Sequence, residues 1–188
     1  MPASRHLRDL ITRLDRHLER WVVHHRTEPF DHVFVWLSKV GTLGFVWIAI
    51  ALVLALLRRQ PSLLLLVVVA DGFADGFARF GKTLVDRARP PIRYPRPEPL
   101  VAVPHDHSFP SGHAASSFAC ATVLAIAVPR LAVPLYLLAT AIAFSRVYVG
   151  VHYPLDVVGG ALLGLAVATA LRWLERALRR LRAAPPAG

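Results

Sequence analysis

Five long apolar segments constrain the fold of this chain more than any other feature. They span residues 33–57, 62–80, 113–128, 131–148 and 155–171. A helix needs about 20 apolar residues to cross the hydrocarbon core of a bilayer, and each segment approaches that length. Hydrophobic residues make up 55% of the 188 residues, a high share for a soluble chain. We therefore expect an all-α integral membrane protein with about five transmembrane helices, forming one domain over residues 1–188.

The connections between these segments predict which helices are neighbours. Residues 58–61 separate the first two segments, and residues 129–130 separate the third and fourth. Breaks this short leave consecutive helices antiparallel and side by side. We expect residues 33–172 to form the transmembrane core and residues 173–188 to form a basic cytoplasmic tail.

Residues 1–28 have the pattern of an amphipathic helix. Arginines alternate with apolar residues spaced by three, four and one, which are Leu7, Leu10, Ile11, Leu14, Leu18, Trp21 and Val22. A helix lying in the headgroup plane accounts for the arginines and for Trp21. A docking face for a partner subunit, as in a homo-oligomer, is the alternative.

The charge distribution indicates a membrane partner. The net charge is +10, which would suit nucleic acid in a soluble protein. Here, however, the basic residues concentrate between and beyond the apolar segments, where anionic headgroups would meet them. We therefore expect no nucleic-acid partner. The positive-inside rule makes the side of the 58–61 and 129–130 connections cytoplasmic, although the basic N-terminal helix falls on the other side.

Three polar clusters are predicted to meet at the outer membrane face, at residues 82–90, 110–113 and 145–156. Lys82, Arg89 and Arg146 are cations without an equal set of carboxylates beside them. A site of this kind requires an anionic ligand, because uncompensated charges are costly in a membrane. Phosphate suits it, since each guanidinium can bind two of its oxygens.

Local patterns refine this site. Ser111 and Gly112 stand at a turn into the third segment, where helix-start amides would point at an anion. Pro154 favours a helix start, which places His152 at the entrance of the fifth segment and Asp156 about one turn further in. A carboxylate behind a histidine orients the imidazole and stabilises its positive charge.

Three motifs occur in order along the chain. The first is Lys82, six residues and Arg89-Pro90; the second is Pro110-Ser111-Gly112-His113; the third is Ser145-Arg146, five residues, His152, three residues and Asp156. In these motifs, over about half its length, the chain resembles the type 2 phosphatidic acid phosphatase superfamily. These membrane lipid phosphatases share an active site with vanadium haloperoxidases and glucose-6-phosphatase. Many of them have six spans, where we expect about five.

The resemblance implies a role for each site residue. His152 would be the nucleophile that forms a phosphohistidine, Asp156 would orient it, and His113 would be the general acid that protonates the leaving oxygen. The phosphate oxygens would be held by Lys82, Arg89, Ser111, Gly112 and Arg146. No metal or cofactor is implied.

The expected function is that of a metal-independent phosphatase acting on a lipid phosphate or a polyprenyl (pyro)phosphate. We expect it in a bacterial inner membrane, with the site facing the periplasm or exterior. A polyprenyl pyrophosphate, a phosphatidylglycerol phosphate and a phosphorylated sugar on a polyprenyl carrier all remain open. Two other functions also stay open, a vanadate-dependent haloperoxidase-like enzyme and a non-catalytic lipid transporter.

Several polar residues lie outside these motifs. Asp71, Asp75 and Arg79 form one stripe on the second segment, for which we expect an interior ion pair between Asp75 and Arg79. A function in headgroup binding or in a proton path is the alternative. Gly72 and Gly76 on that segment are predicted to allow close helix packing.

Other side chains are expected to have simpler roles. We expect Asp86 and Arg87 to be solvated and Cys120 to pack inertly. The loop residues around Asp106 either recognise a headgroup or are solvated. His105 and His107 flank Asp106, but without further ligands we expect no metal there.

Overall fold

The computed structural model describes residues 2–183, and within this range it contains helices and no strands. The helices are α1 (Pro2–His24), α2 (Glu28–Val40), η1 (Thr42–Gly44), α3 (Phe45–Arg58), α4 (Pro61–Leu84), α5 (Pro90–Arg93), α6 (Gly112–Ala127), η2 (Pro129–Leu131), α7 (Ala132–Tyr148) and α8 (Pro154–Ala183). The prediction of an all-α fold is confirmed.

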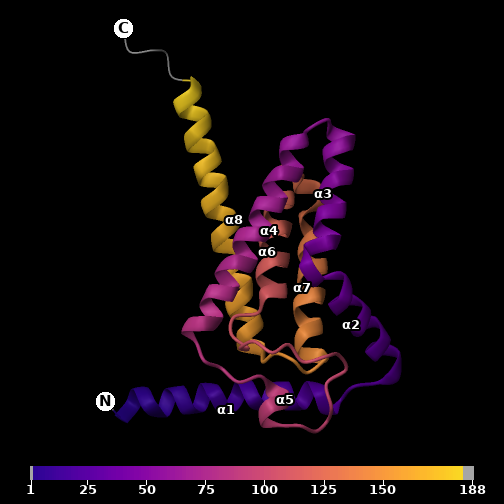
Figure 1. The fold of residues 1–188 in the computed structure, drawn as a ribbon, viewed down its shortest axis with the longest axis vertical. Helices are drawn as coiled ribbons and strands as arrows, with labels where there is room; N and C mark the ends of the chain where they lie inside the picture. Colours follow the sequence, from indigo (N-terminus) through magenta and orange to yellow (C-terminus); the bar gives the residue numbers. More distant parts are fainter. Residues whose placement is uncertain (1, 184–188) are drawn as a thin grey trace.

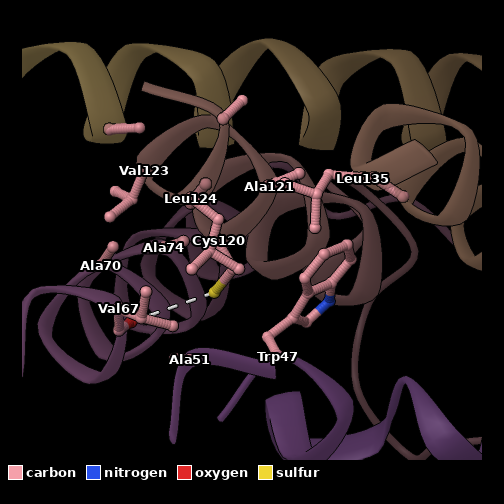
Figure 2. Packing of buried hydrophobic residues seen from close by; sticks show 14 of the residues in the cluster. Trp47, Ala51, Val67, Ala70, Ala74, Cys120, Ala121, Val123, Leu124 and Leu135 are labelled. Atoms are coloured by element: carbon pink, nitrogen blue, oxygen red, sulfur yellow. Dashed lines mark hydrogen bonds between the residues drawn. The ribbon is translucent and has the colours of Figure 1, made fainter. Parts of the chain in front are cut away.

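Helix α6 is the centre of the bundle and packs against α4, α7 and α8 (Figure 1). It is short and rich in small residues, and nearly all of its side chains from Ala114 to Ala125 are buried. Small side chains let neighbouring helices approach closely. Trp47 of α3 fills the core beside them (Figure 2). Its indole Nε1 donates to Ser117 Oγ at 3.2 Å.

Cys120 packs in this core, facing α4 (Figure 2). Its Sγ lies 3.9 Å from both the Val67 carbonyl and Asp71 Oδ1. The thiol is fully buried. The structure therefore agrees with the packing role expected for this residue.

The helices differ in their fitness to span a membrane. Among the described residues, Pro129–Tyr148 and Pro154–Leu181 are long and apolar enough. Helices α2 and α3 are long and apolar enough only when taken together, and the chain bends by 66° between them, so residues 33–57 do not form one straight helix. The bend contains Gly44, whose φ of +67° suits glycine. Five spans therefore remain a prediction, and α8 extends well beyond residue 171 to Ala183.

Helix α1 lies across one end of the bundle, beside the loop that contains α5 (Figure 1). Most of its described apolar residues are exposed, among them Leu10, Leu14 and Leu18, whereas Val23, Asp15 and Glu19 are buried against the protein. The helix therefore docks through a side that includes Asp15, and turns most of its apolar residues outward.

The close helix contact in this fold is made by glycines of α8. A Cβ on Gly160 would meet the Ser111 carbonyl of the α6 N-terminus, and one on Gly164 would lie 2.8 Å from Ala119 N. Gly72 and Gly76 have nothing within 4 Å of such a Cβ, so the prediction that they allow close packing is wrong. Helix α4 instead turns the opposite face, with Ala70, Ala74 and Ala78, into the core.

A matched pair of glycine substitutions tests this packing. We expect Gly164→Ala to destabilise the protein by about 1–3 kcal/mol, because the added methyl group meets α6 backbone atoms. Gly76→Ala is the control and should be neutral or stabilising, since alanine favours a helix by about 1 kcal/mol over glycine. Thermal unfolding in detergent would measure both. Equal midpoints for the two variants would contradict the packing role of Gly164.

Candidate active site

A cavity of about 310 Å³ opens where the C-terminal end of α4 and the N-terminal end of α6 meet the loops. Six of the eight predicted site residues line it: Lys82, Arg89, Gly112, His113, Arg146 and His152. They come from five separate parts of the chain. The fold therefore brings the three motifs together around one space.

His152 lies in the turn between α7 and α8 and is 2% exposed. Its Nε2 is 3.0 Å from Arg89 Nη1, and its Nδ1 is 3.4 Å from Asp156 Oδ2. Burial lowers the pKa of His152 to about 4; Asp156 opposes this shift, while Arg89 and Arg146 add to it. The imidazole is therefore neutral at pH 7, the protonation state that a nucleophile requires.

Asp156 does not line the cavity; it lies behind His152 in the first turn of α8 and is fully buried. Its carboxylate accepts hydrogen bonds from Ser108 Oγ, from the Tyr153 amide at 2.8 Å and from Arg87 Nη1 at 2.5 Å. These donors hold the carboxylate in place beside the imidazole.

Arg87 was expected to be solvated, and this prediction is wrong. Its side chain is 21% exposed and forms ion pairs with Asp156 and with Asp15 of α1. Neither Arg87 nor Ser108 carries a signal in the sequence, because their partners come from distant parts of the chain. Asp86 is exposed, as expected, and pairs with His107 at 3.0 Å.

His113 stands in the first turn of α6 and lines the same cavity as His152. Its Nε2 lies 3.2 Å from the Ser38 carbonyl and 3.4 Å from Thr42 Oγ1. Ser38 lies in the last turn of α2 and Thr42 begins η1, and the sequence did not link either residue to the site. The bend therefore supports the ring of His113.

The cations of the cavity have more partners than the sequence suggested. Arg89 is 1% exposed and donates to the Val151 carbonyl at 2.8 Å. Asp106 bridges Arg89 Nη2 and Lys82 Nζ, each at 2.5 Å. Burial opposes ionisation of this carboxyl, but the two cationic donors outweigh it and lower its pKa to about 2. Asp106 is therefore an anion that already occupies the cationic site.

Arg146 and Ser111 carry buried polar atoms whose hydrogen-bonding capacity is not filled. Arg146 Nη1 donates to Ser38 Oγ, but its Nε has no hydrogen-bond partner within residues 2–183. Ser111 Oγ also has no hydrogen-bond partner among the described residues, although the Ser111 amide donates to the Asp156 carbonyl at 2.9 Å. Buried groups of this kind are rare unless a ligand or water completes them.

The stripe on α4 forms one wall of the cavity. Asp71, Asp75 and Arg79 all line it, and Arg79 Nε pairs with Asp75 Oδ2 at 2.7 Å, as predicted. The pair is exposed, however, and not interior as expected. Across the part of the chain that is described, no three His, Cys, Asp or Glu side chains are grouped as metal ligands.

Comparisons with known proteins agree with this geometry. The family model described as "PAP2 superfamily" matches residues 60–180. An undecaprenyl-diphosphatase of Sulfolobus acidocaldarius is 32% identical over 149 residues, covering 78% of this chain and 71% of its own length. A decaprenylphosphoryl-5-phosphoribose phosphatase of Mycobacterium tuberculosis is 39% identical over 134 residues, covering 70% and 72%.

Solved structures share the fold. The Aquifex aeolicus protein LpxE has a TM-score of 0.70 at 26% identity, covering 83% of this chain and 93% of its own. A transmembrane PAP2-type phosphatidylglycerolphosphate phosphatase from Bacillus subtilis has a TM-score of 0.72 at 24% identity, covering 89% and 87%. With the family match over residues 60–180, these similarities show that the chain is a membrane protein that belongs to the PAP2 superfamily.

Proposed function

We propose that this protein hydrolyses a lipid phosphate or a polyprenyl (pyro)phosphate through a phosphohistidine intermediate and without a metal ion. The observation that carries the proposal is the His152 imidazole, buried between Asp156 and Arg89 at the edge of a cavity lined by cations. The relatives named as polyprenyl diphosphate and lipid phosphate phosphatases support the same substrate class.

The proposed reaction has two steps. His152 Nε2 attacks the terminal phosphorus, a P–N bond forms, and the bond from that phosphorus to the leaving oxygen breaks while His113 gives this oxygen a proton. The leaving oxygen is the ester oxygen of a lipid monophosphate or the bridging oxygen of a diphosphate. Water then attacks the phosphohistidine, gives a proton to His113, and displaces the imidazole as inorganic phosphate forms. One histidine thus acts as nucleophile and the other as acid and then base.

Cations supply most of the catalytic stabilisation in this proposal. Phosphoryl transfer depends on positioning and on stabilising charge at the equatorial oxygens, which Lys82, Arg89 and Arg146 can provide. Arg146 lines the cavity, and its unpartnered Nε is available as a further donor; Ser111 Oγ is also unpartnered, but Ser111 is fully buried and does not line the cavity. This arrangement can replace the metal ions that serve other phosphotransfer enzymes.

Two contacts must change when substrate binds. Arg89 Nη1 lies against Nε2 of His152, the atom that would attack, and Asp106 occupies donors of Lys82 and Arg89. A phosphate group would take over both sets of hydrogen bonds, because its dianion is a stronger acceptor than either partner. The lone pair of Nε2 would then face phosphorus.

We further propose five spans, with α1 lying on the membrane surface. The exposed apolar side of α1, including Trp21, suits the boundary between headgroups and acyl chains. The cavity lies at the α1 end of the bundle, so α1 and the site would share one membrane face, on the periplasmic or exterior side of a bacterial inner membrane.

Loss of the proposed nucleophile is the first test. We expect purified His152→Ala to release inorganic phosphate from farnesyl diphosphate at least about 1,000-fold more slowly than the parent protein. His105→Ala, at an exposed loop histidine, is the control and should keep full activity. EDTA should leave the parent activity unchanged. No release by the parent protein, or dependence on an added metal, would contradict the proposal.

Asp106 offers a second test, because it competes with phosphate for Lys82 and Arg89. We expect Asp106→Asn to bind inorganic phosphate or orthovanadate about 10-fold more tightly, in the range of one charged hydrogen bond. Asp86→Asn, at a more exposed position, should not change binding. Isothermal titration in detergent measures both. Unchanged or weaker binding by Asp106→Asn would show that Asp106 does not compete.

A further inference from the structure

We propose that Asp15 of α1 is a positioning residue of the active site, acting through Arg87 on the Asp156–His152 pair. This inference rests on the proposed function and deepens it. It makes the N-terminal helix, which lies outside the matched family region, a working part of the catalytic site.

The Arg87 guanidinium joins two buried carboxylates. Nη1 donates to Asp156 Oδ1 at 2.5 Å, and Nη2 donates to Asp15 Oδ2. Asp15 is 2% exposed and Asp156 is fully buried. The guanidinium also stacks over the Tyr153 ring, 4.2 Å from its centroid. These contacts fix both the position and the plane of Arg87.

Asp15 makes a second hydrogen bond beside Asp156. Its other oxygen, Oδ1, accepts a hydrogen bond at 2.8 Å from the amide of Leu155, the residue directly before Asp156. One carboxylate of α1 thus holds both the start of α8 and the arginine that contacts Asp156. Asp15 is placed to set the position of the Asp156 carboxylate relative to His152.

The charges of this group explain why the second carboxylate matters. Asp15, Arg87 and Asp156 together carry one net negative charge. Without the charge of Asp15, Arg87 would neutralise Asp156 alone and weaken its support for the positive imidazole that forms as His152 attacks. Asp15 therefore keeps the negative charge of Asp156 available to the nucleophile.

A purely structural role accounts less well for these contacts. Buried ion pairs add little to stability compared with apolar contacts, because both charges must lose their water. Helix α1 has apolar residues that could pack against the bundle, yet it buries Asp15 and leaves Leu14 and Leu18 exposed. The buried carboxylate of Asp15 contacts Arg87 and the Leu155 amide, which lie beside Asp156. Its burial is therefore better explained by a role in placing Asp156.

Steady-state kinetics on the full-length protein, with farnesyl diphosphate in detergent, test the inference. We expect Asp15→Asn to lower kcat about 10-fold or more and to change KM less than about 2-fold, as for loss of a residue that orients a catalytic group. Asp9→Asn, at an exposed carboxylate of the same helix, is the control and should match the parent. In an Asp156→Asn background, Asp15→Asn should cause no further loss, because Asp15 acts through Asp156.

Folding is controlled with Arg87→Lys, which keeps the charge but cannot bridge two carboxylates and should also lower kcat. All rates are normalised to monodisperse protein. The inference is overturned if Asp15→Asn keeps the parent kcat per folded molecule. It is also overturned if Asp15→Asn lowers kcat as much in the Asp156→Asn background as in the parent, or if neither Asp15→Asn nor Arg87→Lys folds. A parent protein that releases no phosphate would overturn the proposed function as well, whereas an active parent with an unaffected Asp15→Asn would overturn this inference alone.

Discussion

The burial of arginine beside histidine is the constraint on which the site depends. Arg89 and Arg146 are almost completely buried next to His152, and an isolated buried charge is costly unless it is paired or hydrogen-bonded. Arg89 is compensated by backbone carbonyls and Asp106, whereas Arg146 retains an unpartnered Nε. The cavity is therefore lined by buried cations, one of which keeps an unfilled donor, and the low pKa of His152 follows from the same burial and the same cations.

The central helix makes this burial possible. Helix α6 carries small residues, so α8 can approach its backbone at Gly160 and Gly164. That approach brings the N-terminal ends of α6 and α8 together, with the Ser111 amide donating to the Asp156 carbonyl. His113 and His152 thus reach one cavity because two helix starts are packed in contact. The α6–α8 contact therefore sets both the packing of the apolar core and the geometry of the site.

The sequence pointed to residues that the fold brings to one cavity, but not to the groups that hold them in place. The cavity residues Lys82, Arg89, His113, Arg146 and His152 could be found because they are ionisable groups at the ends of apolar segments. Asp15, Arg87 and Ser108 could not, since each is an ordinary polar residue whose partner lies far away in the chain. The bend at Gly44 escaped prediction because the apolar run continues through it.

The sequence by itself determined the helical membrane fold, the three motifs and the cationic character of the site, because residue type and spacing are local properties. Only the tertiary structure decided that Asp106 pairs with Lys82 and Arg89, that α8 rather than α4 makes the close glycine contact, and that α1 reaches Asp156 through Arg87. These outcomes depend on which charges are left to pair after the helices have packed, and helix packing is a property of the whole chain.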